Sequence, residues 1–132
     1  MLRTKPILFD GKGLEPLLFI NAEGADHITI AINDAETGKP LPGLGFADYV
    51  GGKRGVVDSE RLQVLWASHV GPDKTPLFAA QGKRVTLEVR FASPAARLYS
   101  FWFASDHCGA SRGWVAAGGA GFNASRDLVG SC

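Results

Sequence analysis

Two aspartates are the strongest candidates for carboxylate chemistry in this sequence. Asp48 and Asp58 stand towards either end of the Gly-rich stretch GFADYVGGKRGVV, residues 45–57. A glycosidase needs two carboxyl groups about 5–10 Å apart across its sugar site, and these two form the best pair that the sequence offers. Oxygen ligands of this kind also suit Ca²⁺. We expect Asp48 and Asp58 to form turns or to hold a structural Ca²⁺ rather than to carry out hydrolysis.

Other residue types with catalytic potential do not stand in a supporting arrangement. Ser105, Asp106 and His107 are consecutive, and consecutive residues of an extended chain point in different directions, which argues against a catalytic triad. The sequence has a GxSxG match, GASRG at residues 109–113, but it lies in the Gly-rich C-terminal segment that we expect to be irregular, whereas a nucleophile elbow joins a strand to a helix. His27, His69 and His107 lack the spacing of zinc ligands. We therefore expect no enzymatic activity from this chain.

Aromatic side chains are better candidates, for ligand binding. Aromatic rings stack on the C–H faces of sugars and bury apolar area, while polar neighbours bind the hydroxyl groups. Tyr49 lies in the Gly-rich stretch, and Trp114 stands near Arg112 in a second Gly-rich segment. The predicted ligand-binding residues are Tyr49, Trp102, Arg112 and Trp114. The alternative for Trp114 is that it anchors the C-terminal segment.

The stretch LYSFWF, residues 98–103, is apolar on both faces of a strand. We expect the bulkier row to face the core, and this row comprises Tyr99, Phe101 and Phe103. The outward row then comprises Leu98, Ser100 and Trp102. An apolar outward row requires a cover, which another domain of a larger parent protein, the C-terminal segment or a docked partner would supply. We therefore interpret the stretch first as a structural strand with an interface side, and second as a sugar platform.

Composition and charge bound the class of protein. The chain has 132 residues, 45% hydrophobic and 20% charged, which suits a single globular domain. Fourteen basic residues against thirteen acidic ones leave a net charge of +1, which gives no electrostatic case for binding nucleic acid or an anionic membrane. No run approaches the roughly 20 apolar residues of a membrane span. The N-terminus MLRTKPILFDG lacks the apolar region of a signal peptide.

The spacing of apolar residues predicts short β-strands through most of the chain. Three alternating rows are predicted to face a core: Ile28, Ile30 and Ile32; Leu62, Val64 and Trp66; and Val85, Leu87, Val89 and Phe91. Residues 45–57 read as a long connection, and residues 75–80 as one helical turn. Many short strands without a long amphipathic helix predict an all-β fold, an antiparallel β-sandwich of jelly-roll type.

The domain organisation follows from a change in composition. We expect a sandwich domain over residues 1–106 and a Gly-rich tail over residues 107–132 that packs on it. The tail holds both cysteines, Cys108 and Cys132, which do not form a CxxC motif. They are either free thiols or a disulfide that closes a loop of about 25 residues.

Several motifs occur in the order of a known module. They are LRTKPILFDG, DAETGKPLPG, DSERLQVLW, LFAAQGKRVTLEVRF and RLYSFWF. Together they resemble the β-sandwich domain that follows the five-bladed β-propeller in exported bacterial proteins of the glycosidase family 32 and 43 type. The resemblance spans residues 2–103, and it departs from the module at Val57-Asp58-Ser59, where the module has Gly-Asp before the serine. The propeller carries the module's catalytic carboxylates, so the resemblance assigns no catalytic residue here.

The resemblance implies a non-catalytic accessory module of a carbohydrate-active protein. Such a module binds carbohydrate or buttresses a glycosidase catalytic domain, and it acts outside the cell or in the periplasm as part of a larger exported protein. The alternative is a structural or protein-interaction domain without sugar binding, whose apolar outer face packs on another protein or forms a homodimer. Exposed aromatic rings with polar neighbours favour the first, and a flat apolar face favours the second.

Overall fold

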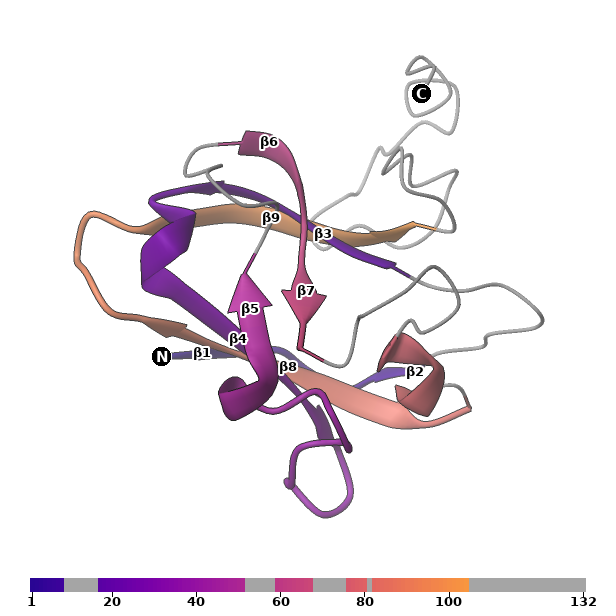
Figure 1. The fold of residues 1–132 in the computed structure, drawn as a ribbon. Helices are drawn as coiled ribbons and strands as arrows, with labels where there is room; N and C mark the ends of the chain where they lie inside the picture. Colours follow the sequence, from indigo (N-terminus) through magenta and orange to yellow (C-terminus); the bar gives the residue numbers. More distant parts are fainter. Residues whose placement is uncertain (9–16, 52–58, 68–75, 81, 105–132) are drawn as a thin grey trace.

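A computed structural model describes residues 1–8, 17–51, 59–67, 76–80 and 82–104 (Figure 1). Its strands are β1 Leu2–Arg3, β2 Ile7–Leu8, β3 Leu17–Glu23, β4 Ile28–Asp34, β5 Tyr49–Gly51, β6 Ser59–Gln63, β7 Leu65–Trp66, β8 Arg84–Phe91 and β9 Arg97–Ala104. Its helices are three 3₁₀ turns: η1 Ala25–His27, η2 Phe46–Asp48 and η3 Pro76–Ala80. The expected all-β fold is confirmed, and so is the helical turn near residue 76. Within the described ranges no helix is long and apolar enough to cross a membrane.

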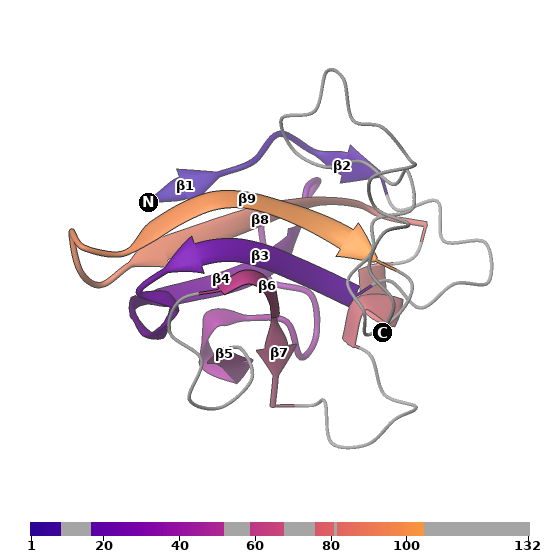
Figure 2. The same ribbon diagram turned by 90° about the horizontal axis from the view of Figure 1, so that it is seen from above.

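The described strands form three antiparallel sheets. In the first, β8 pairs with β1 and β2 along one side and with β4 along the other. In the second, β3 lies between β6 and β9. The third is the short ribbon of β5 and β7. Seen from above, β9 lies over β8 and β3 over β4, so the two larger sheets occupy separate layers (Figure 2).

One hydrophobic core lies between these two layers. The first sheet contributes the predicted rows of β4 and β8, of which Ile28, Ile30, Ile32, Val85, Leu87 and Val89 are all buried. The second sheet contributes Leu18 and Ile20 from β3 and Phe103 from β9. Period-two alternation places each of these side chains on the same face of its strand, which is why one core forms. Phe91 at the end of its row is 37% exposed and does not belong to this core.

The predicted strand over residues 60–66 divides between two sheets. β6 ends at Gln63, the Val64 N–H donates to the Leu18 carbonyl (2.9 Å), and β7 then pairs with β5. Strands that bend from one sheet to another in this way close the side of a two-layer fold. The expected core position of Trp66 is confirmed, because it is 1% exposed and its indole N–H donates to the Ile30 carbonyl (3.2 Å).

A bulge in β9 corrects the expected facing of LYSFWF. Asn21 pairs with Ser100, but the next β3 residue, Ala22, pairs with Leu98, which leaves Tyr99 as the extra residue. An extra residue reverses the alternation beyond it. Tyr99 is therefore 54% exposed, and Leu98 packs against the core with Phe101. The prediction holds for Phe101, Phe103 and Trp102, and it is wrong for Tyr99 and Leu98.

The Gly-rich stretch 45–57 is not a connection throughout. Its first part forms η2 and β5, so the expectation of a long loop is wrong for residues 46–51. In the segment before it, Pro40 forms an isolated antiparallel bridge with Asn33 of β4. Residues 107–132, including Cys108 and Cys132, lie outside the described residues.

We predict that Trp66→Phe lowers the free energy of unfolding by about 2 kcal/mol, because it deletes part of a buried ring and the donor to Ile30. Urea unfolding monitored by circular dichroism measures this change. Val50→Ala is the control, since Val50 is 62% exposed on the neighbouring β5 and its truncation should cost at most about 0.5 kcal/mol. Equal losses in the two variants would contradict the placement of Trp66 in the core.

Candidate functional site

The sheet of β6, β3 and β9 carries a second apolar cluster on the face turned away from the core. Leu17 and Phe19 of β3 form it together with the partly buried Trp102 of β9. Phe19 and Trp102 are cross-strand partners, and their rings stack at 5.9 Å between centroids with an interplanar angle of 17°. Phe19 thus supports Trp102 from within the sheet.

Polar groups stand beside these rings on the same face. Two residues along from the Phe19–Trp102 pair lies the pair of Asn21 and Ser100, both partly exposed. Beyond them, the Tyr99 hydroxyl donates to Glu23 Oε1 (2.9 Å). We call Phe19, Asn21, Glu23, Tyr99, Ser100 and Trp102 the β9 outer face. It joins an aromatic ring that is held in place to hydroxyl, amide and carboxylate groups.

Tyr49, the second predicted ring, lies elsewhere. It begins β5, packs against the main core and meets Trp66 edge-on, with 6.1 Å between ring centroids and an angle of 82°. The expectation that Tyr49 lies in an open loop is therefore wrong. Its hydroxyl is buried and has no hydrogen-bond partner among the described residues, and burial raises the pKa of Tyr49 to about 12. Tyr49 and Trp102 belong to different clusters and do not line one surface.

The other predicted site residues are placed only in part. The Asp48 carboxylate accepts a hydrogen bond from the Gly45 N–H (3.3 Å) and so caps the 3₁₀ turn η2. Among the described residues there is no group of three metal-ligating side chains. Asp58, Arg112 and Trp114 lie outside those residues, and the Ca²⁺ site stays a prediction.

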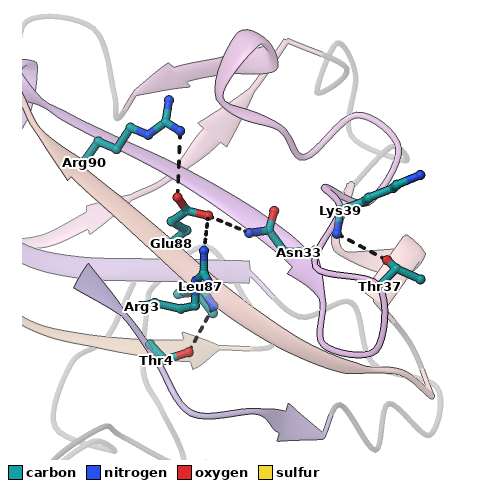
Figure 3. Close-up of polar contacts among 8 residues, drawn as sticks. All are labelled: Arg3, Thr4, Asn33, Thr37, Lys39, Leu87, Glu88 and Arg90. Atoms are coloured by element: carbon teal, nitrogen blue, oxygen red, sulfur yellow. Dashed lines mark hydrogen bonds and ion pairs between the residues drawn. The ribbon is translucent and has the colours of Figure 1, made fainter. Parts of the chain in front are cut away.

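The sheet of β1, β4 and β8 carries a polar cluster that the sequence pattern does not predict. Glu88 points away from the core, yet its side chain is only 10% exposed. Its Oε2 accepts a hydrogen bond from Asn33 Nδ2 (2.9 Å), and Asn33 is itself 3% exposed. Figure 3 shows Arg3 and Arg90 reaching the same carboxylate from two sides. We call Arg3, Asn33, Glu88 and Arg90 the Glu88 cluster.

Sheet pairing brings the Glu88 cluster together. Arg3 of β1 and Ala31 of β4 are the two cross-strand partners of Glu88, and the small Ala31 side chain is fully buried beside it. Arg90 shares a strand face with Glu88, because the two are separated by two positions. That spacing is visible in the sequence. The contact with Asn33, 55 residues away, is not.

One further contact orients Arg90. Its guanidinium carbon lies 3.8 Å from the centroid of the Phe46 ring, within the range of a cation–π interaction. Phe46 belongs to η2, the turn that Asp48 caps, so the turn supports the guanidinium from the side. The Glu88 cluster therefore presents two cations around one nearly buried carboxylate.

Comparisons of the chain with protein-family models, with curated proteins and with solved structures find no match. The resemblance to the module of exported glycosidases thus stays a prediction that depends on the sequence motifs alone.

We predict that Asn33→Ala lowers the free energy of unfolding by about 2 kcal/mol, because Glu88 then loses its buried hydrogen-bond donor. In a Glu88→Gln background, Asn33→Ala should lower the free energy of unfolding by less, because a buried neutral amide loses less free energy than a carboxylate when its hydrogen-bond donor is removed. Urea unfolding of the four proteins gives the coupling energy. An identical loss in both backgrounds would contradict the assigned contact.

We predict a pH dependence from Tyr49. Its pKa is raised from 10.0 to about 12 in the folded protein, so between these values the unfolded chain loses a proton that the folded chain keeps. The associated stability is present below pH 10 and is lost as the pH rises towards 12, by roughly 1–3 kcal/mol. The difference between the parent and Tyr49→Phe in unfolding free energy, measured across this range, isolates the effect. Parallel curves would contradict it.

Proposed function

We propose that this chain is a non-catalytic accessory module of a carbohydrate-active protein and that it binds carbohydrate at the β9 outer face. The observation that carries the proposal is the Trp102 ring stacked on Phe19, with Asn21, Ser100 and Tyr99 beside it. Sugar rings present C–H faces and hydroxyl groups together, and this surface offers a partner to each. A module of this kind carries no catalytic residues of its own.

The support beneath Trp102 favours binding. A side chain that must be ordered on binding costs about 0.5–1.5 kcal/mol, and an aromatic ring already held by stacking avoids much of this cost. Trp102 is partly exposed, so part of its surface is open to a ligand. Burial of that surface against the C–H face of a sugar supplies apolar stabilisation.

The polar groups favour an orientation for the ligand. The Tyr99 hydroxyl donates to Glu23, so its lone pairs and the second Glu23 oxygen are positioned to accept from sugar hydroxyls. Asn21 and Ser100, which lie between Tyr99 and Trp102 along the strands, offer an amide and a hydroxyl. These groups would select among sugars by the directions in which the sugar hydroxyls point.

The wider setting belongs to the same proposal. We regard the two facing sheets as a β-sandwich of jelly-roll type with a Gly-rich tail, like the module that the sequence resembles. Its partners would be carbohydrate and the catalytic domain of a glycosidase. Its location would be extracellular or periplasmic, as part of a larger exported protein.

A second candidate function is a structural or protein-interaction domain without sugar binding. The observation that favours it is the apolar cluster of Leu17, Phe19 and Trp102, which lies outside the main core. In this case the β9 outer face would bury against a catalytic domain or a second copy of the chain. Light scattering after size-exclusion chromatography identifies a dimer.

We predict that the chain binds a neutral polysaccharide in a glycan array and in pull-downs with insoluble polysaccharides. Trp102→Ala should weaken binding at least about tenfold, because it removes the stacking surface. Trp102→Phe keeps a ring and should retain much of the affinity. Val50→Ala on β5 is the control and should bind like the parent.

Two outcomes would contradict sugar binding at this surface. One is a folded parent that binds no neutral glycan, and a dimer in that sample would favour the structural function. The other is binding of a neutral glycan that Trp102→Ala leaves unchanged.

A further inference from the structure

The Glu88 cluster lies on the opposite sheet from the β9 outer face and has no role in the function proposed above. We infer that it is a second binding site, in which Arg3 and Arg90 bind the oxyanion groups of an acidic polysaccharide. The anionic group that the two arginines would bind is a carboxylate or a sulfate ester. The two proposed sites share no residue, so each can fail without the other.

The two guanidiniums keep most of their hydrogen-bonding capacity. Arg3 Nη2 lies 3.4 Å from Glu88 Oε2, and Arg90 Nη2 lies 3.8 Å from Glu88 Oε1. Each contact engages one nitrogen, whereas a guanidinium carries five N–H donors. The Arg3 and Arg90 side chains are 60% and 58% exposed. Their remaining donors can therefore reach an external acceptor.

Glu88 positions the arginines more than it neutralises them. Its carboxylate is committed to the buried Asn33 amide at 2.9 Å and is almost inaccessible to a ligand. Two cations around this one anion leave a local excess of positive charge. The carboxylate thus fixes the two guanidiniums on either side of itself without occupying their outward edges.

Phe46 adds a second constraint on Arg90. The ring lies against the guanidinium at 3.8 Å, which holds the flat face of the group and leaves its edge for hydrogen bonds. A guanidinium edge donates two parallel N–H groups, which match the two oxygens of a carboxylate or sulfate. An arginine that is already oriented loses less conformational freedom when it binds.

The charge on this face extends along β8. Alternate residues of the strand share its outward side, and in this row Arg84 and Arg90 are exposed on either side of Glu88. With Arg3 they make three cations against one nearly buried carboxylate. The whole chain has a net charge of only +1. Asp34, the other acidic residue on the strands of this sheet, lies at the end of β4 and accepts a hydrogen bond from the Glu36 N–H in the turn that follows. The positive excess is therefore local to this outward face. A row of cations along a strand suits a polymer with repeated anionic groups.

The test measures binding of polygalacturonate and of dextran sulfate to the full chain at low ionic strength and at about 0.15 M, with neutral dextran and a DNA duplex as comparisons. We expect at least one acidic polysaccharide to bind, more weakly at the higher salt. Polygalacturonate carries carboxylates and dextran sulfate carries sulfate esters, so the polymer that binds more tightly identifies the anionic group that the site prefers. Neutral dextran should not show this salt-dependent binding.

Substitutions locate the site. Arg90→Gln and Arg3→Gln should each weaken binding about tenfold, the loss expected for a charge-assisted contact. Arg90→Lys keeps the charge but loses the planar edge, so it should recover only part of the affinity. Arg97→Gln on β9 removes the same charge from the other sheet and should leave binding unchanged. Circular dichroism establishes that each variant is folded.

Three results would overturn the inference. The first is no binding of either acidic polysaccharide by the folded parent. The second is an equal loss in Arg97→Gln and Arg90→Gln, which would indicate attraction to overall charge. The third is binding of the DNA duplex as tightly as either polysaccharide, which would indicate a site for polyanions in general.

Discussion

The apolar contact between the two larger sheets fixes which side of every strand is free for function. Isoleucines of β4 and the alternating valines and leucine of β8 face Leu18, Ile20 and Phe103 across one core. A strand whose residues alternate between faces can satisfy this contact with only one of its two faces, because a shift by one residue turns every side chain to the other side. Whatever lies on the other side of each strand is then turned outward. The β9 outer face and the Glu88 cluster are both consequences of this constraint.

The bulge at Tyr99 is the place where the constraint acts most visibly. Without the extra residue, strict alternation would put Tyr99 on the core side with Phe101 and Phe103. The register shift brings Leu98 to the core instead and turns Tyr99 outward, onto the face of Trp102. Bulges commonly redirect a side chain next to a functional site. Here the redirection adds a hydroxyl, held by Glu23, to a surface that already carries a stacked indole ring.

Much of the fold could be predicted because its core rows are strictly alternating. The row of Ile28, Ile30 and Ile32 is apolar on one side and more polar on the other, so its facing follows from the sequence. LYSFWF is apolar on both sides, so alternation alone could not show where Tyr99 is inserted. The expected helical turn near Pro76 was found because proline favours the first helical position.

The candidate sites were predicted less well, for reasons that concern distance along the chain. Trp102 was identified as an outward ring, but its support by Phe19 depends on the pairing of β3 with β9. Tyr49 was expected in a loop because the Gly-rich stretch around it resembles one, and the ring packs on Trp66 instead. The contact of Glu88 with Asn33 joins residues 55 positions apart, and the sequence holds no local sign of it.

Sugar binding at Trp102 is tested by a titration of the isotope-labelled chain with a neutral oligosaccharide that it binds, followed through the indole N–H signals. The sequence has three tryptophans, Trp66, Trp102 and Trp114, and Trp102→Phe and Trp66→Phe assign two of the signals. We predict that the Trp102 signal shifts on binding and that the signal of Trp66, which is buried in the core, stays in place. A bound sugar that leaves the Trp102 signal unmoved would rule out binding at the β9 outer face.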